Sequence, residues 1–323
     1  MAKTMRWIAA GVLAAWWLWP SGGARVPATL QAAVLSDGYA TIEDGRRIVT
    51  YDASGAVRET VAAALPPDTH VVGMVGGAGV VYRDGKQVVV GLLDDDGSVL
   101  DPHRFGRNVR KMCAQTATNQ HRWAVMWVEH DGQLWIVRGP TRRGAAELVA
   151  EPTDDIRAQA AEDYCGVASA EDRTVMLWRG GGATFSAVCD AKRCGGAQRV
   201  KLDARHEIAG YGCTSDGCAI VTRSAAALQA SWMWLRNGKI EWTRPLPSAA
   251  EGTRVTAAGA GKQVAIAYGI EPEPVVRVVD RTGAMKAVWQ APSETVPGLA
   301  WNGSALLVAA YRDGAVATSI VRP

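Results

Sequence analysis

The sequence has little of what defines nucleic-acid-binding and membrane-spanning proteins. Only two of its 323 residues are Phe, and its formal net charge of +3 is small for this length. No basic stretch is interleaved with aromatic residues, so we expect no nucleic-acid partner. The apolar run at residues 7–19 is shorter than the ~20 residues that a spanning helix needs. We therefore expect contact with a membrane only through an uncleaved N-terminal segment.

Motifs for catalysis and for metal or cofactor binding are all incomplete. The acidic loop that begins at Asp94 has Val99 where a calcium loop requires Gly, and residues 259–262 lack the Ser or Thr of a phosphate loop. The five His form no pair at metal-ligand spacing. The acids at residues 154–155 and 271–273 lie in polar or Pro-rich segments, where carboxylates are usually solvated. We therefore assign no catalytic, cofactor-binding or metal-ligating residue and no cofactor.

The N-terminus has the order of features typical of an export signal. Lys3 and Arg6 precede the apolar run, Pro20 ends it, and small residues follow up to Ala24. We predict a signal peptide over residues 1–24 and a single domain over residues 25–323, in the periplasm or outside the cell. The alternative is an uncleaved anchor, with Trp at the membrane interface.

Six cysteines lie in the expected mature chain, an even number that fits an oxidising compartment. Two pairs share one spacing and each brackets a turn, so we expect the local bridges Cys189–Cys194 and Cys213–Cys218. Cys113 and Cys165 would then pair with each other. The alternative is a zinc site formed by the four thiolates of the two closely spaced pairs.

Short strands of alternating hydrophobicity are separated by turn dipeptides along the whole chain. Asp-Gly or Asn-Gly pairs, which favour two-residue hairpins, begin at residues 37, 44, 84, 96, 131, 216, 237, 302 and 313. The best helical stretch is short, at residues 153–161. The pattern predicts an all-β protein.

A loose repeat divides the chain into seven units, which open near residues 34, 71, 112, 164, 212, 255 and 298. The spacing of 37 to 52 residues is typical of propeller blades. We predict a β-propeller of seven four-stranded blades, with tandem β-sandwiches as the alternative. We expect Cys113, Cys165 and Cys213 to occupy matching positions in three successive units. The last unit has room for only three strands, so residues 28–33 are expected to supply its fourth strand.

Two units carry a local resemblance to a known family. The segment Asp280-Arg-Thr-Gly-Ala-Met-Lys-Ala-Val-Trp289 resembles the Asp-x-x-Thr-Gly…Trp repeat of quinoprotein-like propellers, and Asn237–Trp242 is a weaker match. That family includes quinone-dependent dehydrogenases and outer-membrane assembly scaffolds. The resemblance implies a hairpin that docks a Trp on the neighbouring blade.

Nine of the 13 Trp lie beyond the signal segment. In strands, Trp232 and Trp234 would share a face, as would Trp123 and Trp127. We interpret them as packing between blades, with an aromatic platform for a carbohydrate or peptide as the alternative. We expect a monomeric, non-catalytic binding or scaffold propeller with a protein or glycan partner. The alternative is a propeller enzyme that acts on a glycan or on a quinone-linked substrate.

Overall fold

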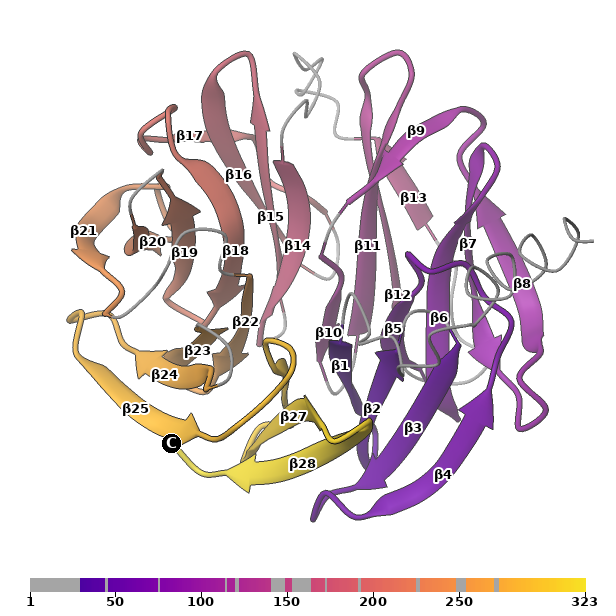
Figure 1. Cartoon of the computed structure of the whole chain (residues 1–323). Helices are drawn as coiled ribbons and strands as arrows, with labels where there is room; N and C mark the ends of the chain where they lie inside the picture. Colours follow the sequence, from indigo (N-terminus) through magenta and orange to yellow (C-terminus); the bar gives the residue numbers. More distant parts are fainter. Residues whose placement is uncertain are drawn as a thin grey trace, which may run out of the picture.

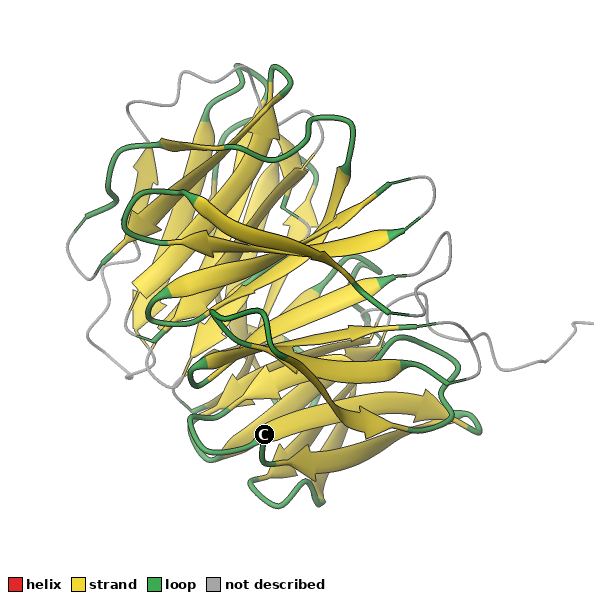
Figure 2. Cartoon of the chain, turned by 90° about the vertical axis from the view of Figure 1, so that its left-hand side faces the viewer, coloured by secondary structure: helices red, strands yellow, loops and turns green. Residues whose placement is uncertain are grey.

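The computed structural model is a ring of seven antiparallel sheets, the blades of a β-propeller (Figure 1). It describes residues 30–43, 46–74, 76–113, 115–119, 122–140, 149–152, 164–171, 173–190, 193–224, 227–247, 254–269 and 273–323. These residues contain 28 strands. The side view shows only strands and loops in the described part of the chain, and no helix (Figure 2). The all-β seven-bladed propeller is therefore confirmed, and tandem sandwiches are excluded.

Each blade is built from consecutive strands, numbered here in chain order. Blade 1 contains β1 (Leu30–Leu35), β2 (Gly38–Glu43), β3 (Arg47–Asp52) and β4 (Val57–Ala62), and blade 2 contains β5 (His70–Met74), β6 (Gly77–Asp84), β7 (Gln87–Leu93) and β8 (Val99–Phe105). Blade 3 contains β9 (Val109–Met112), β10 (Ala117–Asn119), β11 (Arg122–Glu129), β12 (Leu134–Pro140) and β13 (Val149–Pro152). Blade 4 contains β14 (Tyr164–Ala170), β15 (Arg173–Gly180), β16 (Ala183–Cys189) and β17 (Gln198–Val200).

The remaining three blades complete the ring. Blade 5 contains β18 (Glu207–Cys213), β19 (Gly217–Arg223), β20 (Leu228–Trp234) and β21 (Ile240–Pro245). Blade 6 contains β22 (Val255–Ala260), β23 (Gln263–Tyr268), β24 (Val275–Val279) and β25 (Met285–Gln290). Blade 7 contains β26 (Gly298–Trp301), β27 (Leu306–Arg312) and β28 (Ala315–Val321).

The predicted unit openings match the innermost strands to within one residue in blades 2, 4, 6 and 7, whereas β1 begins four residues before the predicted residue 34 and β9 three residues before the predicted residue 112. Blades 4, 6 and 7 begin at the predicted residues 164, 255 and 298, whereas the inner strand of blade 5 begins five residues before the predicted Gly212. In blade 3 the inner strand is split, because β9 and β10 both pair with β11. The helical stretch expected near residue 153 lies outside the described residues.

All eight dipeptides that fall in described residues lie where two paired antiparallel strands reverse direction, as predicted. The Gly of the pairs at residues 84, 96, 131, 237, 302 and 313 has a positive φ. Gly38 and Gly217 instead begin strands at close approaches, since a Cβ on Gly38 would lie 1.9 Å from the Tyr51 oxygen. The ninth pair falls outside the described residues.

The hydrophobic core is divided among the interfaces between blades. Seven buried clusters each join two neighbouring blades, and one of them packs Leu30 and Tyr39 of blade 1 against Leu307 and Ala309 of blade 7. Each blade is therefore stabilised by both of its neighbours, including across the junction of the first and last blades.

The predicted closure of the ring by residues 28–33 is wrong. Leu30–Leu35 pairs with β2 as the innermost strand of blade 1, and blade 7 has three strands among the residues described. The junction is closed by the apolar cluster just described and by a hydrogen bond from the Tyr39 hydroxyl group to the Ala305 oxygen, 3.1 Å long. No shared strand is needed, because every blade of a propeller already ends in an outer edge.

Candidate functional site

All three predicted disulfides are present. Cys113–Cys165 joins blades 3 and 4 across 52 residues, whereas Cys189–Cys194 and Cys213–Cys218 each close a separation of five. Because no cysteine is free, the four-thiolate zinc site is wrong. The predicted equivalence of Cys113, Cys165 and Cys213 is also wrong, since Cys165 is the second residue of β14 and Cys213 the last of β18.

The loop between the third and fourth strands has one design in several blades. In blade 1 the Asp52 Oδ1 atom accepts hydrogen bonds from the Ser54 and Ala56 amides, at 2.8 and 3.0 Å. Asp280 makes the equivalent bonds to Thr282 and Ala284 in blade 6. The bonds from the Ser54 side chain and then the Ala56 amide lower the pKa of Asp52.

The loop at Asp94 in blade 2 shares the main-chain bonds of the Asp52 loop: the Asp94 N–H group donates to the Ser98 oxygen and the Gly97 N–H group to the Asp94 oxygen. It is therefore a hairpin tip, as predicted. The repeat that was identified from the sequence at Asp280 and Asn237 therefore has two further copies, Asp52-Ala-Ser-Gly-Ala and Asp94-Asp-Asp-Gly-Ser. The signal was present in the sequence and was missed.

These loops hold the ring together by resting on the preceding blade. A Cβ on Gly97 would lie 2.1 Å from the Ala62 oxygen at the end of β4, so only Gly allows this approach. Gly55 similarly lies against Ile320 of β28, and Gly283 against Arg244 of β21. The repeated motif therefore has a structural role between blades.

The aromatic residues mainly pack within and between blades. Trp127, Trp178 and Trp232 are fully buried, and each stacks on an aromatic ring of the adjacent strand, with centroids 5.7 to 6.3 Å apart. The shared faces predicted for Trp123 with Trp127 and for Trp232 with Trp234 are confirmed, since each pair lies in one cluster.

Two half-buried Trp dock on the next blade, as the family resemblance implied. The Trp242 indole N–H donates to the Arg281 oxygen of blade 6 at 2.8 Å, and that of Trp289 to the Ser319 hydroxyl of blade 7 at 3.2 Å.

The main chains of the innermost strands of blades 4 to 6 approach one another closely. A Cβ on Gly259 would lie 2.1 Å from the Cys213 oxygen and 3.7 Å from the Ser169 oxygen, which belong to blades 5 and 4. The Gln115 amide nitrogen donates to the Tyr211 oxygen at 2.7 Å, and the Tyr164 hydroxyl donates to the Gln115 side-chain oxygen at 3.2 Å. One side chain of blade 3 thus links three blades.

The histidines are separated in the structure. His70 is buried at the start of β5, where burial lowers its pKa to about 4, whereas His103 and His130 are exposed on other strands and loops of blades 2 and 3. The His206 Nε2 atom lies 4.0 Å from the Asp203 Oδ2 atom. His121 falls outside the described residues. Within the described ranges, no group of three or more His, Cys, Asp or Glu side chains could hold a metal ion.

The candidate acid pairs give no catalytic arrangement in the part of the chain that is described. Glu273 accepts a 3.3 Å hydrogen bond from Gln290 on the surface, and its partner Glu271 is outside the described residues, as is the pair at residues 154–155. The segment at residues 259–262 is the end of β22 and the turn that follows it.

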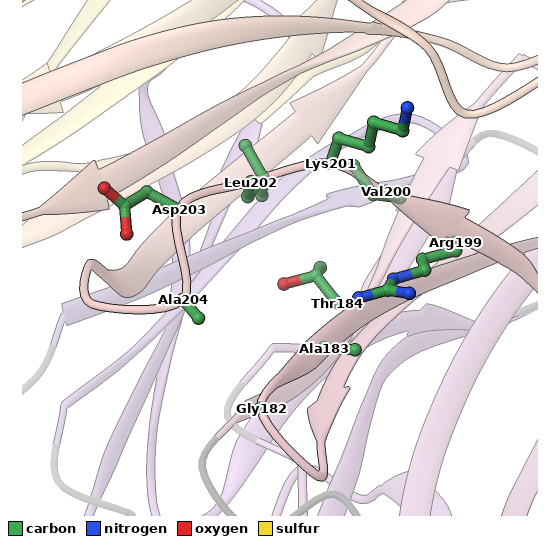
Figure 3. A pocket seen from close by; sticks show the side chains of 9 residues that line it. All are labelled: Gly182, Ala183, Thr184, Arg199, Val200, Lys201, Leu202, Asp203 and Ala204. Atoms are coloured by element: carbon green, nitrogen blue, oxygen red, sulfur yellow. The ribbon is translucent and has the colours of Figure 1, made fainter.

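A pocket of about 520 Å³ lies at the rim of blade 4 (Figure 3). Its walls are the start of β16, the short strand β17 and the loop that follows β17. Its lining residues are Gly182, Ala183, Thr184, Arg199, Val200, Lys201, Leu202, Asp203 and Ala204. Arg199 and Lys201 are exposed, so the pocket presents two cations to solvent.

A buried arginine holds the wall of this pocket in place. Arg179 is 4% exposed, and its guanidinium donates to the Asp203, Ala204 and His206 backbone oxygens and to the Thr184 hydroxyl. The one carboxylate of the pocket is already engaged, because Arg205 donates to Asp203 through its side chain and its amide, which lowers the Asp203 pKa. The pocket therefore has an excess of positive charge.

Sequence reasoning did not find Gln115, Arg179, Arg199 or Lys201. None of them belongs to a motif, and they come together only when strands of different blades or of one sheet are folded. No described helix is long and apolar enough to cross a membrane.

No family model and no curated protein matches the sequence. Many solved structures are similar in fold. The Kuenenia stuttgartiensis hydrazine synthase matches with a TM-score of 0.60 at 12% identity, over 92% of this chain and 96% of that one. The Neurospora crassa Pan2 WD40 domain (TM-score 0.57, 10% identity, 94% and 91% covered) and the polysaccharide lyase Uly1 (0.57, 9%, 90% and 89%) match similarly. At such identities the likeness shows the propeller fold alone.

Proposed function

We propose that this chain is an exported binding or scaffold propeller whose blade 4 pocket receives an anionic group of a protein or glycan partner. The observation that carries the proposal is the pair of exposed cations, Arg199 and Lys201, beside a wall fixed by the buried Arg179. Cations bind carboxylate, sulfate or phosphate groups by charge-assisted hydrogen bonds. Because Asp203 is occupied by Arg205, it does not neutralise the pocket.

The proposal is tested by binding of carboxylate-bearing probes. A fluorescent oligogalacturonate and an oligoglutamate peptide are titrated against the protein, with methyl-esterified oligogalacturonate as the uncharged control. The double variant Arg199→Ala/Lys201→Ala should weaken binding about a hundredfold, since it removes two charged bonds that are each worth about 1.5 kcal/mol. Lys262→Ala, an exposed lysine in a turn of blade 6, is the matched control. An affinity that is unchanged by methyl esterification of the probe, or unchanged in the double variant, would refute the pocket assignment.

The alternative of a glycan-cleaving enzyme is motivated by the fold shared with a polysaccharide lyase. The same oligogalacturonate, analysed by chromatography after incubation, should stay intact under our proposal. Shorter products that depend on Arg199 and Lys201 would favour the enzyme instead.

Export is supported by the three disulfides, because such bonds persist in oxidising compartments. We expect the mature protein to begin within a few residues of Arg25, as measured by mass spectrometry of the exported product. An intact Met1 in the membrane fraction would favour the anchored form.

A further inference from the structure

Among the described residues, blade 7 is the blade without a fourth strand, so the outer edge of β28 is left open there. In blades 1 to 6 the third strand is covered by a fourth, whereas no described strand pairs with the outer edge of β28. In consequence Ala315 and Ala317 are exposed and the rest of the strand is half-buried, unlike the mostly buried third strand β24 of blade 6.

The register of the hairpin shows which backbone groups are free on this edge. Asp313 and Gly314, with φ of 51° and 77°, form a two-residue turn that pairs Arg312 with Ala315. Alternate residues of an antiparallel strand bond the same neighbour. Ala315, Ala317 and Ser319 therefore bond β27, and the N–H and C=O groups of Val316, Thr318 and Ile320 point away from it.

The sequence of β28 lacks the protection found on the other outer strands. All six outermost strands of blades 1 to 6 contain at least one charged residue, such as Arg58 in β4 or Lys286 in β25, and three of them contain Pro. The strand Ala-Val-Ala-Thr-Ser-Ile-Val has neither charge nor Pro. Natural proteins use such residues to keep edges from pairing, so β28 has the composition of a strand that is to be covered.

Apolar side chains of blades 1 and 6 lie near β28. In blade 1 the Val57 side chain is 62% exposed. It lies two residues after Gly55, and a Cβ atom on Gly55 would be 3.2 Å from the Ile320 side chain of β28. On the blade 6 side, the half-buried Trp289 bonds Ser319. Figure 1 places β28 at the outer rim, with the C-terminus beside β25.

Blade 7 extends less far from the axis than its neighbours, and this difference favours a single strand over a second propeller as the occupant of the edge. Neighbouring strands are about 4.8 Å apart, so a three-stranded blade ends about one strand short of its four-stranded neighbours. The outer strands β25 and β4 would hold two such edges apart if two propellers met through them. A single extended chain adds one strand spacing, about 4.8 Å, and so brings blade 7 to the depth of its neighbours.

The N-terminal residues of this chain are a poor source of that strand. If cleavage follows Ala24, five residues precede β1, fewer than the seven (63–69) that connect β4 to β5 alone. With a connection of that length (residues 23–29), the uncleaved segment would place Pro20 and Gly22 in the position of the strand, and these residues disfavour strands.

We propose that the open edge of β28 binds an extended, uncharged segment of a partner protein, which adds to blade 7 as its fourth strand. The segment runs antiparallel to β28, exchanges hydrogen bonds with Val316, Thr318 and Ile320, and carries β-branched apolar side chains that pack beside Val57 and Trp289. The inference rests on the proposed binding role but uses a different surface from the blade 4 pocket.

The test uses the exported protein and the acetylated, amidated heptapeptide Thr-Val-Thr-Val-Thr-Val-Lys, whose Lys amine is acylated by an uncharged fluorescent label so that the peptide has no charge. We expect saturable binding by anisotropy and slowed hydrogen exchange over residues 314–321, and no binding of the same peptide with Pro at its central Val. Val316→Pro, which removes an outward N–H group, should weaken binding at least tenfold, whereas Val316→Thr keeps it. Ala317→Lys, which places a charge on the edge strand, should also weaken binding of the peptide, whereas its control Ala317→Ser should keep it. This pair of variants tests the edge without altering the backbone.

The Arg199→Ala/Lys201→Ala variant should bind the heptapeptide like the parent, so failure of the pocket and failure of the edge are distinguishable. Absence of peptide binding would overturn the proposal, as would loss of binding in that pocket variant. Slow exchange of the Val316, Thr318 and Ile320 amides in the protein alone would also overturn it. Protection at all concentrations would mean that the chain covers its own edge, and protection that rises with a dimer mass would mean that a second copy does.

Discussion

The Thr318 hydroxyl group donates a 2.8 Å hydrogen bond to the backbone oxygen of Gly55, which joins the last strand of blade 7 to a loop of blade 1. The two residues are 263 positions apart in the chain. This bond and the apolar cluster at the same junction take the place of a shared strand.

Thr318→Val should lower the free energy of unfolding by about 1 kcal/mol, because it removes this bond while keeping the shape of the side chain. Urea denaturation followed by circular dichroism measures the effect. Thr60→Val, on the exposed surface of β4, is the control and should change the stability by less than about 0.5 kcal/mol. Equal effects of the two substitutions would mean that the Thr318 bond contributes nothing to closure.

Gln115→Leu should destabilise the ring by about 2 kcal/mol, since it leaves the Tyr211 oxygen and the Tyr164 hydroxyl near the axis without their partner. Gln290→Leu removes only an exposed bond to Glu273 and should be close to neutral. Thermal unfolding compares the two variants. If they melt together, the Gln115 network does not stabilise the axis.

The three disulfides should contribute unequally. On the loop-entropy estimate, removal of Cys113–Cys165 costs about 4 kcal/mol and removal of a five-residue bridge about 2 kcal/mol. The double Ala variants of Cys113/Cys165 and of Cys213/Cys218 are compared by guanidinium denaturation under non-reducing conditions. A larger loss from the short bridge would contradict the estimate.

Acid should destabilise the protein through His70. Burial lowers the pKa of this imidazole to about 4 in the folded chain, against 6.5 when it is exposed. The unfolded chain therefore binds a proton first as the pH falls, so the free energy of unfolding decreases from about pH 6.5 down to about pH 4 and then levels off, by at most about 3 kcal/mol.

His70→Leu should flatten this part of the stability–pH curve, whereas the exposed His103→Leu should leave it unchanged. Urea titrations at a series of pH values provide the measurement. An unchanged slope in His70→Leu would assign the acid sensitivity to other groups.

The blade repeat could be predicted because it depends on local signals. Alternating strands and Asp-Gly or Asn-Gly turns gave the seven units, and the even cysteine count with its two close pairs gave the disulfides. The start of blade 5 was misplaced because its inner strand, Glu-Ile-Ala-Gly-Tyr-Gly-Cys, is short of large apolar residues where it packs against β22. Small residues at a close approach leave little hydrophobic pattern.

The closure and the candidate pocket depended on relations that the sequence does not express locally. The expected fourth strand at residues 28–33 followed from treating an outer edge as forbidden, although each blade has one. Arg179 and Arg199 lie on β15 and β17, and nothing in their neighbours signals that one guanidinium holds a loop while the other faces solvent. Such roles follow from the assembled sheet.

The contiguous construction of blades 1 and 7 makes the ring suitable for circular permutation. Leu30 and Val321 belong to different sheets, so the chain ends can be joined without dividing a blade. A linker from Pro323 back to Leu30 would have to travel in the direction opposite to β28 and alongside it. The joined chain would thus supply in cis the fourth strand that we propose a partner supplies in trans, while new ends opened between blades 4 and 5, within residues 201–206, would leave every sheet intact.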